Sequence, residues 1–225
     1  MHSHYSIPVL TIDGPSGAGK GTIAREVVLA TGWHFLDSGA LYRLTGLYCK
    51  LRGVDTLDPE SAADLAANLP AEFVVGEDGE RVFLDGADVT VELRTETTGA
   101  LASQVAAQQP VRDALLQLQR DFRKPPGLVA DGRDMGTVVF PAADFKVFLT
   151  ASAHERAERR YKQLKERGAD VSLASLTEEI AGRDRRDATR AASPLVPAAD
   201  AQVIDTTGIG IEAVKERVLV MLAGA

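Results

Sequence analysis

The feature of this sequence that most constrains its fold is a glycine-rich segment between an apolar run and a helical pattern. Residues 14–22 read Gly-Pro-Ser-Gly-Ala-Gly-Lys-Gly-Thr, and the apolar residues 9–12 precede them. Glycine lets the backbone turn tightly with its N–H groups facing inward, and the following helix N-terminus adds a partial positive charge. A strand, a loop and a helix in this order are the structural context of a phosphate-binding P-loop.

Lys20 and Thr22 predict how this loop is used. Lys20 would hold the β- and γ-phosphates of a nucleoside triphosphate, and we expect its side chain to extend into an open loop. Ser or Thr usually follows this lysine, but Gly21 takes that place here, so Thr22 is left to approach Mg²⁺ directly or through water. A glycine-rich turn with an incidental lysine is the alternative. We assign the following loop residues to ATP: Gly14, Pro15, Ser16, Gly17, Ala18, Gly19, Lys20, Gly21 and Thr22.

Apolar periodicity along the chain predicts an α/β fold. Short apolar runs bounded by Gly, Pro, Asp or Ser are typical of strands, and they cover residues 9–13, 34–36, 128–131, 146–150 and 202–205. Helical spacing is found at residues 22–30, which end before Gly32 as a C-cap, and at residues 110–122, 152–168, 173–186 and 214–222. Strands that alternate with helices indicate a P-loop NTPase-type parallel five-stranded sheet flanked by helices.

One stretch, residues 73–91, breaks this alternation. It contains two apolar runs separated by Asp78-Gly79, which is a strong hairpin signal. We therefore predict a small β-rich insertion after the second strand, near the carboxyl ends of the parallel strands, where ligands bind. A surface decoration without function is the alternative.

Composition narrows the functional class. The chain has 225 residues and a net charge of −7, which argues against a partner that is a long nucleic acid. No apolar run approaches the roughly 20 residues of a membrane span, and the first residues lack the order of a secretory signal. A single cysteine, Cys49, fits a reducing compartment. We expect a cytoplasmic monomer that binds neither a membrane nor a nucleic-acid polymer.

Asp131 distinguishes among the classes of P-loop protein. It ends the strand at residues 128–131 and can serve the Mg²⁺ shell, but Gly132 follows it, so no adjacent carboxylate prepares water for attack. An ATPase motor would usually have that second carboxylate, and a GTPase would carry Asn-Lys-x-Asp, which is absent. The sequence therefore favours a small-molecule kinase. Arg133 and Asp134 come next, at the ligand edge of the sheet, with a loop salt bridge as the alternative.

Two arginine clusters predict a lid. Arg183, Arg186, Asp187 and Arg190 share one face if their segment is helical, and a solvated face laced with ion pairs is the alternative. A second cluster lies on the preceding helix and contains Arg156, Arg159 and Arg160, of which we assign Arg159 to ATP. Two such helices joined by residues 168–170 would close over ATP and expel water.

With these segments identified, the chain resembles the bacterial cytidylate kinases over nearly its whole length. The matching segments are residues 12–22, 36–43, 102–106, 131–141 and 194–201. The P-loop alone is shared by many kinases, whereas Leu-Asp-Ser-Gly-Ala-x-Tyr-Arg and Asp-Gly-Arg-Asp-Met-Gly are far more specific.

The resemblance implies roles for individual residues. Ser103, Arg112 and Asp134 would read the cytosine ring; Arg43, Arg133 and Arg190 would grip the acceptor phosphate, with Ser38 and Tyr42 alongside; Arg183 and Asp187 would meet the sugar. Lys20, Arg133 and Arg190 are the expected catalytic cations, and Thr22 and Asp131 are the residues expected to contact Mg²⁺, directly or through water.

The resemblance implies the phosphorylation of CMP and dCMP by ATP with Mg²⁺. We expect a single kinase domain, with its core at about 7–60, 105–152 and 187–225. The acceptor-binding insertion would lie at about 61–104 and the lid at about 155–186. Another small-molecule kinase, acting on a different monophosphate or on a metabolite hydroxyl, is the alternative, and a P-loop protein that only binds is third.

Overall fold

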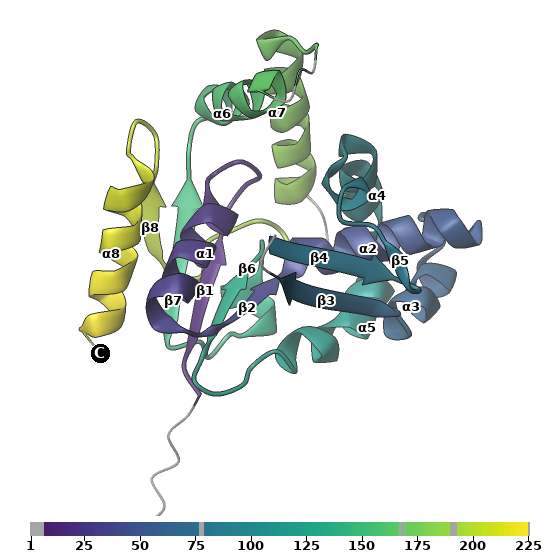
Figure 1. Ribbon diagram of the computed structural model, residues 1–225, viewed down its shortest axis with the longest axis horizontal. Coiled ribbons are helices and arrows are strands. Elements are labelled where there is room, and N and C mark those ends of the chain that lie inside the picture. Colours follow the sequence, from purple (N-terminus) through teal and green to yellow (C-terminus); the bar gives the residue numbers. More distant parts are fainter. Residues whose placement is uncertain (1–6, 77–78, 167, 169, 190–192, 225) are drawn as a thin grey trace, which may run out of the picture. The chain divides into compact units, whose positions relative to one another are not determined.

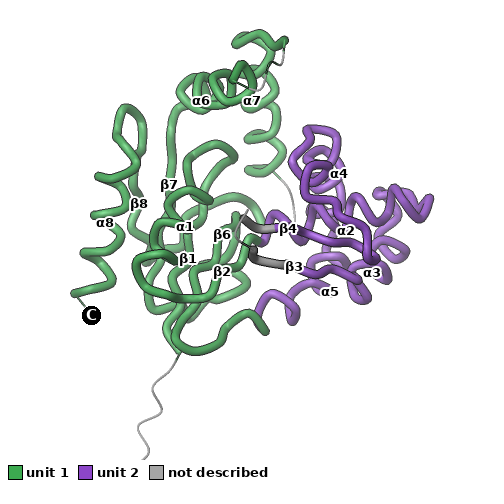
Figure 2. The backbone as a smooth tube through the Cα atoms, in the orientation of Figure 1, with its two compact units in different colours: residues 1–37, 121–225 green, residues 38–120 purple. Residues whose placement is uncertain are grey.

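The protein folds into two compact units, residues 1–37 with 121–225 and residues 38–120 (Figure 2). The computed structural model describes residues 7–76, 79–166, 168, 170–189 and 193–224. In the part of the chain that it describes, every helix is too short or too polar to cross a bilayer.

The first unit is built on a parallel five-stranded sheet in the order β2-β6-β1-β7-β8 (Figure 1). Its strands are β1 (Val9–Asp13), β2 (His34–Asp37), β6 (Leu128–Asp131), β7 (Phe145–Thr150) and β8 (Gln202–Asp205). All neighbouring strands pair in parallel. The predicted sheet is thus confirmed, with strand ends that differ from the prediction by at most one residue.

The α-helices in the described part of this unit are α1 (Lys20–Thr31), α6 (Ala153–Glu166), α7 (Leu173–Thr189) and α8 (Ile211–Ala223). Gly32 ends α1 in the left-handed conformation, and its N–H donates to Val28 O at 2.8 Å, as the sequence predicted. Buried Leu10, Ile12 and Leu149 of the central strands pack with Ile23 and Val27 of α1. This apolar core fixes the strand ends from which the loops of the site emerge.

Strand order places the P-loop at a switch point of the sheet. From β1 the chain moves to one side of the sheet for β2 and β6, then crosses to the other side for β7 and β8. Ligands of such sheets bind beyond the carboxyl ends of the strands at this point. The P-loop follows β1, Asp131 ends β6, and β7 leads into α6 at the same edge (Figure 1).

The second unit contains the helices α2 (Ser38–Arg52), α3 (Pro59–Ala67), α4 (Glu96–Ala106) and α5 (Gln109–Arg120), with the short 3₁₀ turn η1 (Glu92–Arg94). Asp58 caps α3 and Thr95 caps α4 through their side-chain oxygens. Gly46 lets α2 approach α4 closely, because a Cβ there would lie 2.8 Å from Leu101 Cβ.

The predicted β-rich insertion is a three-stranded antiparallel sheet in the second unit. Its strands are β3 (Ala71–Gly76), β4 (Gly79–Leu84) and β5 (Ala87–Asp88). Val82, Leu84 and Val89 pack with Leu44 and Leu47 of α2 in a core of their own. The expected turn at Asp78-Gly79 falls partly outside the described residues, but the strands on either side of it confirm the hairpin.

Candidate active site

The P-loop backbone has the conformation that its glycines permit. Gly14, Gly17 and Gly19 have φ angles of 143°, 79° and 92°, a region that L side chains rarely adopt. At Gly14 a Cβ would also lie 2.0 Å from Leu149 O. The loop therefore depends on glycine at these positions, and α1 begins at Lys20 directly after it.

Lys20 lies in a buried position and not in the open loop that the sequence suggested. It is 6% exposed, its Nζ donates to Pro15 O at 3.1 Å, and the Asp131 carboxylate lies 3.8 Å away. Burial lowers the pKa of Lys20, and the nearby Arg133 guanidinium lowers it further. Burial raises the pKa of Asp131, which the Lys20 charge opposes. The phosphates of a bound nucleotide would favour the protonated lysine.

Thr22 and Asp131, the predicted magnesium residues, lie on α1 and at the end of β6. Thr22 is exposed and Asp131 is 8% exposed. A Cβ at Gly21 would come within 3.4 Å of Asp131 Oδ2, so the residue after the lysine does face this carboxylate. Among the described residues, no three His, Cys, Asp or Glu side chains gather closely enough to hold a metal ion by themselves.

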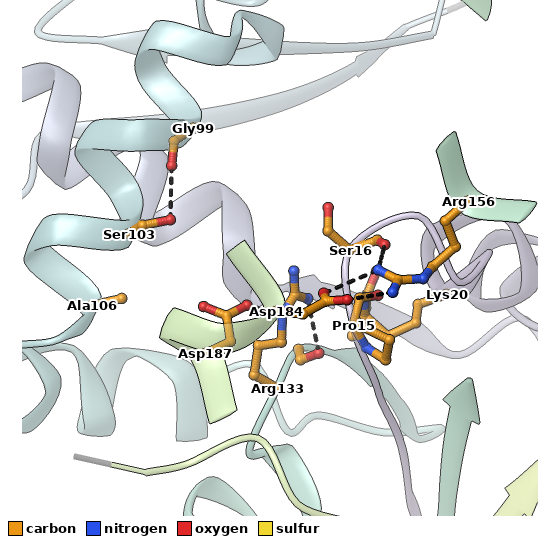
Figure 3. Close-up of polar contacts among 12 residues, drawn as sticks. Pro15, Ser16, Lys20, Gly99, Ser103, Ala106, Arg133, Arg156, Asp184 and Asp187 are labelled. Carbon is orange, nitrogen blue, oxygen red and sulfur yellow. Dashed lines mark hydrogen bonds and ion pairs between the residues drawn. The ribbon is translucent and has the colours of Figure 1, made fainter. Parts of the chain in front are cut away.

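Arg133 and Asp187 form an ion pair within the first unit. Arg133 Nε donates to Asp187 Oδ2 at 3.2 Å, and Asp187 on α7 is 6% exposed. Asp134, which follows Arg133 in the sequence, is 2% exposed. Arg183 lies four residues before Asp187 on α7 and is half-buried. Figure 3 shows Arg133 and Asp187 next to one another. Arg190, a predicted catalytic residue, lies outside the described residues.

Arg156 and Arg159 of α6 contact the loops at the carboxyl edge of the sheet. Arg159 donates to Thr206 O at 2.7 Å, directly after β8, and to Glu155 at 3.1 Å. Arg156 had no individual role in the sequence analysis; it is 3% exposed and donates to Ser16 O of the P-loop at 2.9 Å (Figure 3). It also pairs with Asp184 of α7. The only signal for Arg156 in the sequence was its place in the arginine cluster.

The second unit contains two of the predicted base-reading residues, Ser103 on α4 and Arg112 on α5, and the predicted phosphate-binding residues Ser38, Tyr42 and Arg43 on α2. Arg112 Nη1 donates to Ala106 O at 3.1 Å, and its guanidinium lies 5.5 Å from the Tyr42 ring centroid. Arg43 donates to Leu93 O at 2.8 Å and to Thr95 O at 3.2 Å.

Gly99 of α4 joins two of these residues. A Cβ on Gly99 would lie 3.3 Å from two nitrogens of Arg43, and the carbonyl oxygen of Gly99 accepts from Ser103 Oγ at 3.1 Å (Figure 3). A side chain at position 99 would therefore displace the Arg43 guanidinium.

Ser38 has a partner that the sequence did not reveal. Its Oγ donates to Gln119 Oε1 at 2.8 Å, and Gln119, 1% exposed, donates in turn to Leu115 O at 3.3 Å. A hydroxyl has one hydrogen to give, so Ser38 has to exchange this partner before it can donate to a phosphate.

The parallel sheet and the loop that follows its first strand define a protein of the P-loop class. Comparison with known proteins narrows the class: a family model described as cytidylate kinase matches residues 10–223. The chain is 57% identical over 216 residues to the cytidylate kinase of Pseudomonas paraeruginosa (strain DSM 24068 / PA7), covering 95% of this chain and 94% of the relative. The cytidylate kinase of Pseudomonas aeruginosa (strain UCBPP-PA14) gives the same identity and coverage. The chain belongs to the cytidylate kinase family.

Solved structures with a similar fold are more distant. A gluconokinase from Sinorhizobium meliloti 1021 is 15% identical, with a TM-score of 0.47 over 96% of this chain and 92% of that one. A thymidylate kinase from Candida albicans is 12% identical, with a TM-score of 0.40 over 97% and 92%. Likeness at this level carries no argument about the acceptor.

Proposed function

We propose that this protein transfers the γ-phosphate of ATP to CMP and dCMP, giving ADP with CDP or dCDP. The observation that carries the proposal is a P-loop lysine, buried beside a strand-end carboxylate, in a chain that belongs to the cytidylate kinase family. No covalent intermediate is needed, because a positioned acceptor phosphate can attack the γ-phosphorus in line.

The first unit would hold ATP. The backbone N–H groups of residues 16–22 would cradle the phosphates, and Lys20 would neutralise the charge that develops during transfer. Its contact with Pro15 O keeps the ammonium group within the loop. Arg159 supports the nucleotide from α6, and its bonds to Thr206 show how that helix is held against the loop after β8.

CMP would be bound by the residues that the resemblance to the cytidylate kinases assigns to it. We assign Ser103, Arg112 and Asp134 to the cytosine ring, Arg183 and Asp187 to the sugar, and Ser38, Tyr42, Arg43, Arg133 and Arg190 to the phosphate. A carboxylate accepts from the exocyclic amine of cytosine, and a guanidinium donates to its ring nitrogen and carbonyl. The ion pair between Arg133 and Asp187 joins a residue assigned to the acceptor phosphate to a residue assigned to the sugar.

Asp131 and Thr22 fit a magnesium ion that arrives with ATP. Carboxylate and hydroxyl oxygens are the hard ligands that Mg²⁺ prefers, and Mg²⁺ usually keeps several waters and phosphate oxygens beside one or two protein ligands. A site with few protein ligands is therefore expected. When bound, the ion would neutralise charge on the β- and γ-phosphates.

Catalysis by these residues is positioning together with charge neutralisation. The acceptor phosphate is already ionised at neutral pH, so no residue has to act as a general base. We also propose that residues 61–104 form the acceptor-binding insertion and residues 155–186 the lid, whose closure expels water. The cytoplasmic location and the monomeric state stay predictions from the sequence.

An acceptor panel tests this function. ADP formation from ATP and Mg²⁺ is followed with CMP, dCMP, UMP, AMP and GMP, with a polyol and a sugar, and without acceptor. We expect the highest kcat/KM with CMP and dCMP and a negligible rate without acceptor. Faster turnover of another monophosphate or of a hydroxyl acceptor would assign the protein a different substrate, and ADP formation independent of acceptor would make it an ATPase.

A further inference from the structure

Asp13 is a buried carboxylate for which the assignment above has no role. It is the last residue of β1, directly before Gly14, and is 4% exposed. Its Oδ1 accepts from the N–H of Met135 at 2.8 Å, and its Oδ2 accepts from the N–H of Gly136 at 2.8 Å. Both oxygens of this side chain are thus bound to the segment that follows β6.

The two N–H groups belong to the start of the π-helical turn η2 (Met135–Val139). The first carbonyl of this turn is that of Asp134, which accepts from Val138 N at 2.9 Å and from Val139 N at 3.2 Å. The first N–H groups of a helical turn find no partner within it. Asp134 does not cap the turn with its own side chain. Asp13 supplies the missing acceptors and so determines where the turn begins.

The segment between β6 and η2 is closely fitted. Gly132 N–H donates to Ile12 O at 3.1 Å, and a Cβ on Gly132 would lie 2.7 Å from Met135 Cγ. A Cβ on Gly136 would lie 2.9 Å from Thr11 Oγ1 and 3.4 Å from Asp13 Oδ2. Arg133 and Asp134 therefore lie in a segment, residues 132–136, whose two ends are both hydrogen-bonded to β1.

We propose that Asp13 is a positioning residue for acceptor recognition, holding the 132–136 segment so that Arg133 and Asp134 meet CMP. This inference rests on the proposed assignment of those two residues to the acceptor. Asp13 is also the residue directly before Gly14, the first residue of the P-loop. One carboxylate therefore connects the 132–136 segment, which we call the acceptor-reading segment, to the strand that precedes the P-loop.

Asp13→Asn tests this role with little change of shape. An amide has one accepting oxygen, and its NH₂ group would face one of the two backbone N–H donors. We expect kcat/KM for CMP to fall about tenfold or more, with a narrower preference for CMP over UMP. The KM for ATP should rise less than that for CMP, because both oxygens of Asp13 bind the 132–136 segment, whereas Asp13 acts on Lys20 of the P-loop through its charge.

Asp144→Asn is the matched control. Asp144 Oδ2 accepts from the N–H of Val9 at 2.9 Å, so it is also a carboxylate on a backbone N–H, but it lies at the opposite end of β1. We expect this variant to keep both KM values and the ratio of CMP to UMP activity.

Each outcome decides the inference. It is overturned if Asp13→Asn lowers the activity with CMP and UMP equally, if the KM for ATP rises as much as that for CMP, or if Asp144→Asn has the same effect. Should Asp13→Asn fail to fold, Gly136→Ala crowds the same junction, and a CMP preference unchanged in that variant refutes the role. Wild-type protein that does not favour CMP refutes the proposed function instead.

Discussion

Lys20→Met is the perturbation that examines the phosphate site most closely. Methionine keeps the apolar stem and removes the charge. Lys20 Nζ and Asp131 Oδ1 are 3.8 Å apart and both residues are buried, so their attraction is about 4 kcal/mol at an effective dielectric constant near 20. The loss of stability should be smaller than this value. Burial already raises the pKa of Asp131, so the carboxyl can take up a proton when its partner is removed, and burying the lysine itself has a desolvation cost.

The rate should change far more than the stability of the fold. A charge that acts on the transferring phosphate is commonly worth about 3 kcal/mol in the transition state, or about a hundredfold in kcat. The assay is ADP formation at saturating ATP and CMP, with the folded fraction measured by circular dichroism and thermal unfolding.

Lys146→Met is the control for a buried lysine. Lys146 is 8% exposed and donates to Pro141 O at 2.7 Å and to Asp200 Oδ1 at 2.9 Å. Like Lys20, it therefore contacts a proline carbonyl and a carboxylate, but it lies on β7. We expect lower stability in both variants and the loss of turnover in Lys20→Met alone. If folded Lys20→Met turned over at nearly the wild-type rate, or if both variants lost the same activity, the phosphate role of Lys20 would be wrong.

Three further predictions follow from the site. Asp134→Asn can turn an amide donor toward the carbonyl of UMP, so the ratio of kcat/KM for CMP to that for UMP should fall by about ten- to a hundredfold while the KM for ATP is kept; equal losses with both acceptors would mean that the base is read elsewhere. CMP should slow amide hydrogen exchange in β4 and β5 more than ATP does, since closure over the acceptor orders the insertion, and exchange that ignores saturating CMP would make it a surface decoration. Burial raises the pKa of Asp13 from 3.8 to about 6, so the Asp13 carboxyl binds a proton more tightly in the folded state than in the unfolded state. The contribution of this protonation to the free energy of unfolding is complete below the unfolded pKa and is lost as the pH rises through about 6. The unfolding free energy of wild type minus that of Asp13→Asn should therefore fall between about pH 3.8 and 6. A difference that stays constant over this range would contradict the raised pKa of Asp13.

The strands of the first unit could be predicted because their signals are local. Each is a short apolar run, and residues such as Asp13, Asp131 and Asp205 mark where it ends. The α2 helix was not predicted, because it begins at Ser38 directly after β2 with no separating loop. The η2 turn was also missed. The groups that define its start come from Asp13, 122 and 123 residues away, and no local pattern contains them.

In the candidate site, too, the features with a local sequence signal could be predicted, and those that depend on distant residues could not. Loop glycines and Lys20 were visible as a motif, since the chemistry of phosphate binding requires them at fixed spacing. The burial of Lys20 was not visible, because its partner Asp131 lies at the end of β6, far from Lys20 in the sequence. The bond from Ser38 to Gln119, 81 residues apart, and that from Arg156 to Ser16, 140 residues apart, depend in the same way on the folded arrangement.

Label transfer from ATP tests the central claim most directly. ATP carrying a radioactive γ-phosphate is incubated with CMP, Mg²⁺ and the protein, and the labelled products are separated and counted against the ADP formed. We predict that the label appears as the β-phosphate of CDP in equal amount to ADP, and that Lys20→Met loses this transfer. Label that appears as inorganic phosphate, or CMP that stays unlabelled while ADP accumulates, would contradict the account.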